Sequence, residues 1–276
     1  MTADEPELGR LMAPVGRLLA EASRLLKETW QAGASVRHKG PADLVTDADL
    51  AVQRFLIPSL VGLLPGSSIL AEEDGQVPAD PTAPCWVIDP VDGTSNLVHG
   101  VRYVAISVAL AVGGQPILAW VQDVFGDHLY TARRGHGAWA DGTPIHGSAR
   151  TALTEAMVAC GTPYEKERAE FVFAPLARVW LACHGLRMLG AAALELAEVA
   201  AGRLDAFFEA SLSPWDFAAG WLLVSESGGV VTDLKGAPLK MASGSVLAAN
   251  AGLHRELLTI LADPAAPAGR EAGHQG

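Results

Sequence analysis

Cysteines and long apolar runs are scarce in this chain, and each shortage excludes a class of protein. The sequence has three cysteines, Cys85, Cys160 and Cys183, at wide and irregular spacing. That number and spacing do not suit a disulfide framework or a thiolate metal site. No apolar run reaches the ~18–20 residues that span a membrane, and the N-terminus is acidic, unlike a secretory leader. We therefore expect reduced, buried cysteines in a cytoplasmic protein without a membrane partner.

Positive charge is also in short supply. The chain carries 20 Lys and Arg against 31 Asp and Glu, which gives a net charge of −11. This balance argues against nucleic acid or an anionic membrane as the main partner. It leaves a phosphorylated small molecule possible as a substrate, because bound divalent cations would invert the local field.

Two common kinds of functional motif are missing as well. The histidines His99, His128, His136 and His146 do not form a pair with metal-ligand spacing. The segment Gly135-His136-Gly137 lacks the Gly-Lys-Ser/Thr ending of a phosphate-binding loop, and we interpret it as a hairpin turn. A histidine metal site and a nucleotide loop are therefore disfavoured.

The remaining pattern is that of a layered globular enzyme. At 276 residues, half of them apolar, the chain can bury a large core. Helical periodicity predicts helices over 8–30, 47–64, 167–184, 191–201, 215–227 and 254–262, and strand signals cover 68–70, 85–88, 103–112, 115–123, 129–132, 157–160, 187–189, 204–209, 230–232 and 245–249. The first half suggests helices on an antiparallel sheet, and the second half alternates helices and strands. We expect an α+β, layered αβαβα fold: one domain over 1–264, with subdomains at about 1–150 and 151–264 that share a cleft, and a disordered tail at 265–276.

The most informative segment is Asp89-Pro90-Val91-Asp92-Gly93-Thr94-Ser95-Asn96. Its two carboxylates follow the apolar run Cys85–Ile88, which we expect to be a short buried strand, and they precede a predicted helix start. Carboxylates in such a place can hold hard cations, and free backbone N–H groups can hold a phosphate. The segment predicts metal-assisted phosphate chemistry.

Further acids lie at predicted element boundaries: Asp49, the pair Glu72-Glu73, and Asp216. Taken singly, Asp49 and Asp216 would be helix N-caps and Glu72-Glu73 a solvated loop. Taken together with Asp89 and Asp92, they predict one acidic site.

These segments carry a resemblance to a known family. Its first signature is similar to Lys39-Gly-Pro-Ala-Asp43-Leu-Val-Thr46-Asp47-Ala-Asp49, and its Gly-Glu-Glu signature to Ala71-Glu72-Glu73, where Ala71 replaces the usual glycine. The central motif matches Asp89–Asn96 in full, and the C-terminal motif matches Trp215-Asp216-Phe-Ala-Ala-Gly220 with Glu226-Ser-Gly228-Gly229. From about residue 10 to 262 the chain resembles the inositol monophosphatase family of Mg²⁺-dependent, lithium-sensitive sugar phosphatases.

The resemblance implies a site with two to three Mg²⁺ ions that activate water without a phosphoenzyme. Its metal ligands would be Glu72, Asp89, Asp92, Asp216 and the carbonyl of Val91, with Asp89 bridging two ions. Thr94, hydrogen-bonded to Asp49, would orient the attacking water and accept its proton, and Glu73 would assist. The N–H groups of Gly93 and Thr94 would hold the phosphate.

The substrate side is also implied by the resemblance. Glu209, Gly190, Ala191 and Ala192 would contact the leaving group beside Asp92 and Asp216, and Lys39 would close over the site. Ala191 departs from the hydroxyl residue common in the family, which removes one hydrogen bond to a polyol. Inositol 1-phosphate is the leading substrate; histidinol phosphate, a nucleotide and a natural-product intermediate are alternatives. A non-catalytic regulatory binding protein on the same fold is the alternative from another class.

The resemblance further implies a homodimer. The apolar region from Phe171 to Leu181 is the segment that we expect to contribute to its interface.

Overall fold

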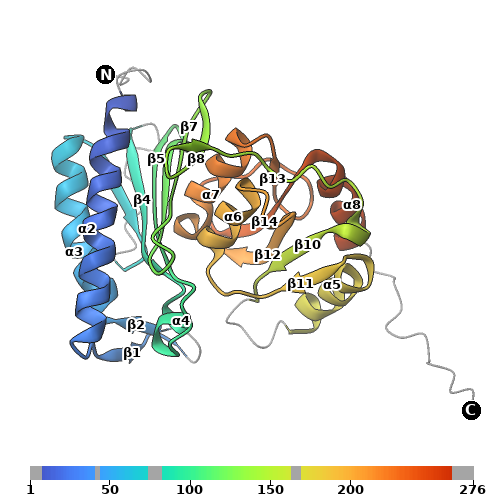
Figure 1. Cartoon of the computed structure of the whole chain (residues 1–276), viewed down its shortest axis with the longest axis horizontal. Helices are drawn as coiled ribbons and strands as arrows, with labels where there is room; N and C mark the ends of the chain where they lie inside the picture. Colours follow the sequence, from blue (N-terminus) through green and yellow to red (C-terminus); the bar gives the residue numbers. More distant parts are fainter. Residues whose placement is uncertain (1–7, 41–43, 74–82, 163–168, 263–276) are drawn as a thin grey trace, which may run out of the picture.

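The structure, a computed structural model, describes residues 8–40, 44–73, 83–162 and 169–262. The predicted tail and Asp43 lie outside the described residues. Two sheets and the helices that cover them form alternating layers (Figure 1).

The first half of the chain builds a seven-stranded sheet. Its strands follow one another in space in chain order: β3 (Ser68–Ala71), β4 (Cys85–Asp92), β5 (Ala105–Val112), β6 (Gln115–Asp123), β7 (Leu129–Arg133), β8 (Gly137–Ala140) and β9 (Thr143–Pro144). The sheet is antiparallel as predicted, except that β3 and β4 run parallel. The segments of β8 and β9 were predicted as tight turns only, and this was wrong. β8 pairs with β7 on one side and with β9 on the other, and β9 lies at the edge of the sheet; both short strands are stabilised by these partners.

Two long helices cover the outer face of this sheet. After a 3₁₀ turn (Gly9–Leu11), α2 (Met12–Gln31) and α3 (Asp47–Leu63) pack a row of leucines and valines against Trp86, Ile88 and Trp120 of the sheet. A small antiparallel pair that the sequence did not predict, β1 (Val36–His38) and β2 (Leu44–Thr46), leads into α3.

The second half builds a five-stranded mixed sheet in the order β11-β10-β12-β14-β13. Its strands are β10 (Met157–Cys160), β11 (Gly185–Arg187), β12 (Ala206–Leu212), β13 (Val230–Thr232) and β14 (Gly244–Ala249); its helices are α5 (Ala169–Ala182), α6 (Ala192–Ala200), α7 (Pro214–Glu226) and α8 (Ala251–Ala262), and a 3₁₀ turn spans Leu153–Glu155. β11 lies two residues before its predicted place because its register is set by pairing with β10.

The helices α6 and α7 lie between the two sheets. Their side chains share one apolar cluster with Val87 and Ala109 of the first sheet and with Phe207 and Val246 of the second. A separate cluster packs α8 and the Val179 position of α5 under the outer face of the second sheet. The order helix, sheet, helix, sheet, helix confirms the predicted layered αβαβα fold (Figure 1).

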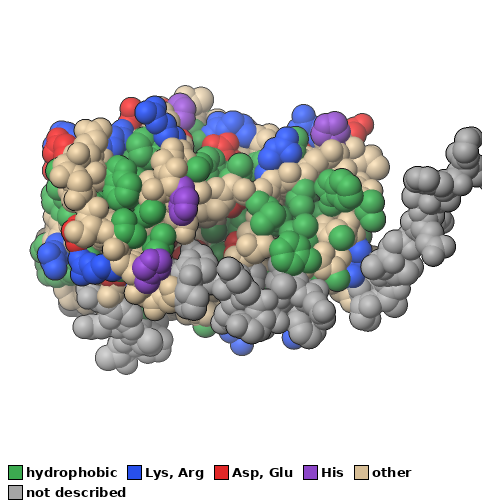
Figure 2. All heavy atoms as spheres, turned by 90° about the horizontal axis from the view of Figure 1, so that it is seen from below, with side chains coloured by type: hydrophobic (Ala, Val, Ile, Leu, Met, Phe, Trp, Pro, Cys, Tyr) green, Lys and Arg blue, Asp and Glu red, His purple; other side chains and the backbone are tan. Residues whose placement is uncertain are grey.

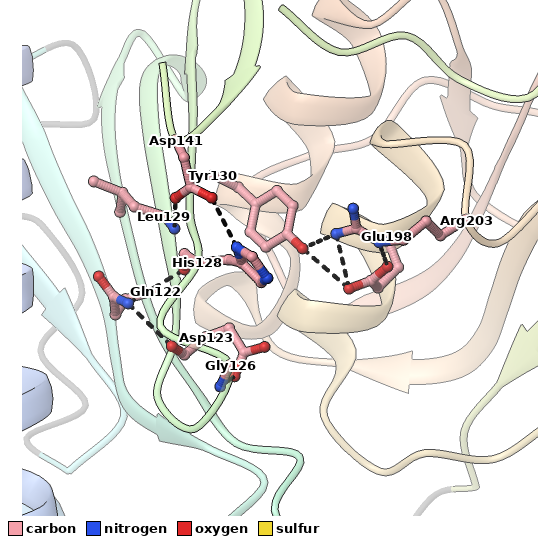
Figure 3. A network of polar contacts seen from close by, with 9 residues as sticks. All are labelled: Gln122, Asp123, Gly126, His128, Leu129, Tyr130, Asp141, Glu198 and Arg203. Carbon is pink, nitrogen blue, oxygen red and sulfur yellow. Dashed lines mark hydrogen bonds and ion pairs between the residues drawn. The ribbon is translucent and has the colours of Figure 1, made fainter. Parts of the chain in front are cut away.

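A polar network ties α6 to the first sheet (Figure 3). The hydroxyl of Tyr130 on β7 donates to Glu198 Oε1 at 3.1 Å, and Arg203 contacts both Glu198 and the Tyr130 hydroxyl. The Arg203 guanidinium also lies 5.3 Å from the centroid of the Tyr130 ring. The network fixes the helix whose N-terminal end reaches the functional site described next. Among the described helices, none is long and apolar enough to cross a membrane.

Candidate active site

A cavity of about 480 Å³ lies where the ends of β4, β12, α6 and α7 meet. Its lining includes the segment Val91–Asn96, the loop that precedes α6, the end of β12 and the start of α7. Among the described residues that line it there are six carboxylates and no Lys, Arg or His: the acids are Glu72, Asp89, Asp92, Glu195, Glu209 and Asp216. The cavity is therefore strongly acidic although it lies inside the molecule.

Asp89 and Asp92 lie within β4, and the prediction that they follow a strand ending at Ile88 was wrong. The pairing register with β5 shifts between them, since Asp89 faces Ser107 and Asp92 faces Ala105. Proline at position 90 has no N–H for the ladder, which suits an irregular position of this kind. Asp89 accepts a hydrogen bond from the N–H of Val91 at 3.0 Å, and Asp92 accepts from the first N–H groups of α6, at 2.9 Å from Ala193.

Asp49 and Asp216 hold equivalent places on two different helices. Each is the third residue of its helix and closes a capping box with the residue before the helix, Thr46 for α3 and Ser213 for α7. Asp49 accepts from the N–H of Thr46 at 2.9 Å, and Asp216 from the N–H of Ser213 at 2.7 Å. The interpretation of Asp49 and Asp216 as N-cap residues was therefore wrong. Each lies three residues after the N-cap, and its carboxylate is oriented by the hydrogen bond to the N-cap residue.

Thr94 is the link between Asp49 and the cavity. Its hydroxyl lies 2.9 Å from Asp49 Oδ1 and 2.9 Å from the carbonyl of Val91. A hydroxyl carries one hydrogen, so it donates to one of these two oxygens at a time. Gly93 precedes it with φ 91°, at the start of the short helix α4 (Thr94–Val98), and a Cβ there would meet the carbonyl of Tyr103 at 3.0 Å. This position therefore requires glycine.

Glu72 and Glu73 are not a solvated loop, contrary to the structural interpretation of this pair. Their side chains are only 19 % and 6 % exposed, and Lys39 Nζ lies 2.7 and 2.8 Å from their carboxylates. Burial alone would lower the pKa of Lys39, but attraction to Glu72 and Glu73 outweighs it and the pKa is raised. Lys39 therefore serves as a counter-ion at the rim of the acidic site.

The carboxylates of the cavity are short of positive charge. Burial, followed by repulsion from neighbouring acids, raises the pKa values of Asp89 and Asp92 well above their usual range, and burial also raises that of Glu72. Buried like charges of this kind are favourable only when a cation neutralises them.

The donor set fits magnesium in its chemistry. Carboxylate and carbonyl oxygens, without nitrogen or sulfur, are the ligands that Mg²⁺ prefers. Over the described ranges, no three His, Cys, Asp or Glu side chains are already grouped to hold an ion. Lys39 engages Glu72, and backbone N–H groups engage one oxygen each of Asp89 and Asp92. The residues fit the ion: each carboxylate keeps lone pairs for it, and loading requires Lys39 to release Glu72.

The predicted substrate residues are divided between the wall of the cavity and positions outside it. Gly190, Ala191, Ala192 and Glu209 line the cavity, whereas Asp49, Glu73 and Lys39 do not. Asp49 reaches the cavity only through Thr94, and Glu73 only through the Lys39 contact that it shares with Glu72.

Sequence reasoning missed two residues of this wall. Glu195, 1 % exposed, lines the cavity and accepts from the N–H of Leu189 at 3.1 Å. The side-chain amide of Asn96 donates to the carbonyls of Tyr103 and Leu189, at 2.8 and 2.7 Å. The sequence could have indicated Glu195, because it is an acid in the first turn after Gly190-Ala191-Ala192. No neighbouring residue indicates that Asn96 contacts Leu189, which is 93 positions away.

Comparison with known proteins agrees with this geometry. The profile described as the inositol monophosphatase family matches residues 11–265. The chain is 38 % identical over 228 residues to an inositol-1-monophosphatase of Mesorhizobium japonicum, covering 82 % of this chain and 85 % of that protein. It is also 38 % identical over 226 residues to the Nus factor SuhB of Escherichia coli, with the same two shares covered.

Solved structures show the same likeness. The extragenic suppressor protein suhB of Bartonella henselae superposes with a TM-score of 0.85 at 32 % identity, covering 93 % of this chain and all of that one. An inositol monophosphatase from Anabaena superposes with a TM-score of 0.82 at 31 % identity, covering 92 % and 96 %.

Proposed function

The chain belongs to the inositol monophosphatase family and is a phosphoric monoester hydrolase, and we propose that it is a Mg²⁺-dependent enzyme that hydrolyses a small polyol or sugar phosphate. Inositol 1-phosphate is the substrate that we put first. The observation that carries the proposal is the meeting of Glu72, Asp89, Asp92 and Asp216 in one buried cavity beside Thr94.

The proposed ligands of the ions are these four carboxylates and the carbonyl of Val91. Bound Mg²⁺ supplies charge neutralisation at the phosphate and a lowered pKa for water. The chain itself holds the ligands in place: α6 donates backbone hydrogen bonds to Asp92, and the capping box of α7 orients Asp216. Because the ligands are fixed by backbone groups, few side chains must be ordered at the moment of binding.

The proposed proton path runs from the attacking water to Thr94 Oγ1 and on to Asp49. When Thr94 donates to Asp49, a lone pair of its hydroxyl remains for the water. Burial raises the pKa of Asp49, which makes this carboxylate a better proton acceptor than an exposed one. Glu73 lies behind this path beside Glu72, and the N–H groups of Gly93 and Thr94 are the proposed phosphate contacts.

We propose that Glu209 and the segment Gly190–Ala192 contact the leaving group. All four residues line the cavity. Lys39 stays a proposed substrate contact that reaches the site from its rim.

The test is phosphate release with Mg²⁺ from inositol, histidinol, sugar and nucleotide monophosphates, with and without lithium. Asp89→Asn should reduce the rate by more than about 100-fold. Loss of a residue that only supports a metal ligand costs up to about 100-fold, and loss of a ligand itself should cost more. Asp127→Asn is the matched control, because Asp127 is exposed and lies outside the cavity lining, where it pairs with Lys27. Persistence of the wild-type rate in Asp89→Asn would show that the proposed metal mechanism is wrong.

A homodimer is part of the proposal. Phe173, Trp180 and Leu181 on α5 are 52 %, 61 % and 78 % exposed, and Figure 2 shows hydrophobic side chains on the face of the C-terminal half. Sedimentation should give the mass of two chains, and Trp180→Glu should shift it toward one. A single-chain mass for the wild type would contradict the dimer.

A regulatory role is the second candidate, favoured by the relatives named Nus factor SuhB. Complementation of a strain that lacks this protein distinguishes a regulatory role from a catalytic one. If regulation is the cellular role, Asp89→Asn should restore the phenotype as well as the wild type does, whereas a catalytic role requires the active protein.

A further inference from the structure

Two of the six cavity carboxylates, Glu195 and Glu209, have no place in the proposed metal site. Both lie in the wall of the cavity, and Glu209 is one of the residues that we propose to contact the leaving group. The surroundings of each side chain indicate what it can bind.

Glu209 is a buried acid that points into the cavity. Along β12 it shares a face with Phe207, which packs in the cluster between the two sheets. Its exposed fraction is 8 %, and within the described ranges its carboxylate has no hydrogen-bond or ion-pair partner. Gly161 makes room for it, because a Cβ at that position would lie 2.0 Å from Glu209 Oε2.

Glu195 closes the same wall from α6. Its carboxylate accepts from the N–H of Leu189, which holds the loop that carries Gly190 and Ala191. This leaves the acid at the cavity surface, where it adds negative charge beside Glu209.

Among the described residues that line the cavity, no Lys, Arg or His lies beside this pair to neutralise it. Burial, then repulsion from Glu195, Asp216 and Asp92, raises the pKa of Glu209 to about 9, and burial raises that of Glu195 to about 8. Two buried carboxylates in the wall of one cavity favour a positively charged ligand. A polyol hydroxyl is uncharged and cannot neutralise the buried carboxylates. An ammonium group supplies both a positive charge and three hydrogen-bond donors.

We infer that this cavity prefers a phosphate monoester whose leaving alcohol carries a positively charged nitrogen, bound between Glu195 and Glu209. The inference rests on the proposed phosphomonoesterase function and narrows its substrate class. Ala191 agrees with it, because a methyl group there offers a polyol no hydrogen bond. The reaction is unchanged: the P–O ester bond breaks, water supplies the new P–O bond, and the amino alcohol leaves protonated on oxygen.

The test compares matched phosphate esters that differ only in an amine for a hydroxyl. Suitable pairs are glucosamine 6-phosphate with glucose 6-phosphate, and 3-aminopropyl phosphate with 3-hydroxypropyl phosphate. A charge-assisted hydrogen bond predicts a kcat/KM that is roughly 10- to 100-fold higher for the amine in at least one pair. Glu209→Gln and Glu195→Gln should bring that ratio close to one. Glu256→Gln, at an exposed position of α8 outside the cavity lining, should leave the ratio unchanged.

A binding measurement keeps this inference separate from catalysis. With Mg²⁺ present, saturation-transfer NMR should show 3-aminopropanol bound to the wild type more strongly than 1,3-propanediol, and Glu209→Gln should lose the difference. If no ester releases phosphate while this difference is present, the proposed function fails and the amine site stands. If esters are hydrolysed with no amine preference in either pair, or if neither variant changes the ratio, the amine inference is overturned and the phosphatase stands.

Discussion

Thr94 Oγ1 lies 2.9 Å from Asp49 Oδ1, although the two residues are 45 positions apart. The other oxygen of Asp49 accepts from the N–H of Thr46 at the start of α3. The capping box therefore fixes the carboxylate, and the carboxylate directs the threonine hydroxyl. Helix capping and the proposed proton path depend on the same side chain.

Replacement of the Thr94 hydroxyl tests this path. Thr94→Val keeps the shape but removes the acceptor, so kcat should fall by roughly 10²- to 10⁴-fold, the contribution of a general base. Thr94→Ser should retain activity within about tenfold of the wild type, because its hydroxyl can make the same bond to Asp49. Steady-state phosphate release measures both. Equal rates for the valine and serine variants would exclude the hydroxyl from proton transfer.

Lys39 competes with the proposed metal for the same carboxylate. Its ammonium lies 2.7 Å from Glu72, so ion binding must displace it. Lys39→Met should therefore raise the affinity for Mg²⁺ several-fold in calorimetry, as expected when a competing charge-assisted bond is removed. Lys27→Met, which removes an exposed ion pair with Asp127, is the control. Weaker Mg²⁺ binding would instead mean that Lys39 positions Glu72 for the ion.

Gly161 makes room for the Glu209 carboxylate, so a larger residue at position 161 tests whether the position of that carboxylate matters. Gly161→Ala places a Cβ 2.0 Å from Glu209 Oε2, so the carboxylate must move and kcat/KM should fall. We expect a loss of about 10- to 100-fold, as for other displaced supporting groups. Gly62→Ala meets no atom within 4 Å on the exposed side of α3 and should stabilise the fold by about 0.5–1 kcal/mol without loss of activity. Unchanged kinetics in Gly161→Ala would show that the position of Glu209 is not needed.

Glu195 predicts a pH dependence of stability in the metal-free protein. Burial raises its folded pKa from 4.5 to about 8, so between these values the folded state binds more protons than the unfolded state. The stabilisation is complete below about pH 4.5 and is lost as the pH rises to about 8, by at most about 5 kcal/mol. In urea unfolding at a series of pH values, Glu195→Gln should make the slope shallower by this share, because Glu209 keeps a raised pKa of its own. The exposed Glu256→Gln should retain the full slope. A parallel pH profile for Glu195→Gln and the wild type would contradict the assignment.

Local sequence patterns predicted most of the helices and strands. The helices of α2, α3, α6 and α7 follow from apolar residues at three- and four-residue spacing, and the long strands β5 and β6 follow from β-branched runs bounded by glycine turns. The strands β8 and β9 could not be predicted because their pairing partners, rather than their own residues, stabilise them. The two-residue error at β11 has the same origin.

For the candidate site, too, the sequence predicted the local motif but not the features that depend on strand pairing. The motif around Asp89 indicated metal-assisted phosphate chemistry from the sequence, since two acids beside Gly93 and Thr94 are a local pattern. Their true place inside β4 depends on a register shift against β5, which the motif does not encode.

The sequence by itself determined the element order, the acidic motifs and the family that they resemble, because these depend on neighbours within a few positions of the chain. Only the tertiary structure placed Glu195 beside Glu209, Lys39 on Glu72, and Asp92 at the N-terminus of α6. The physical reason is that burial and charge depend on which distant segments pack together. A carboxylate receives its hydrogen-bond partners, its pKa and its role from those segments.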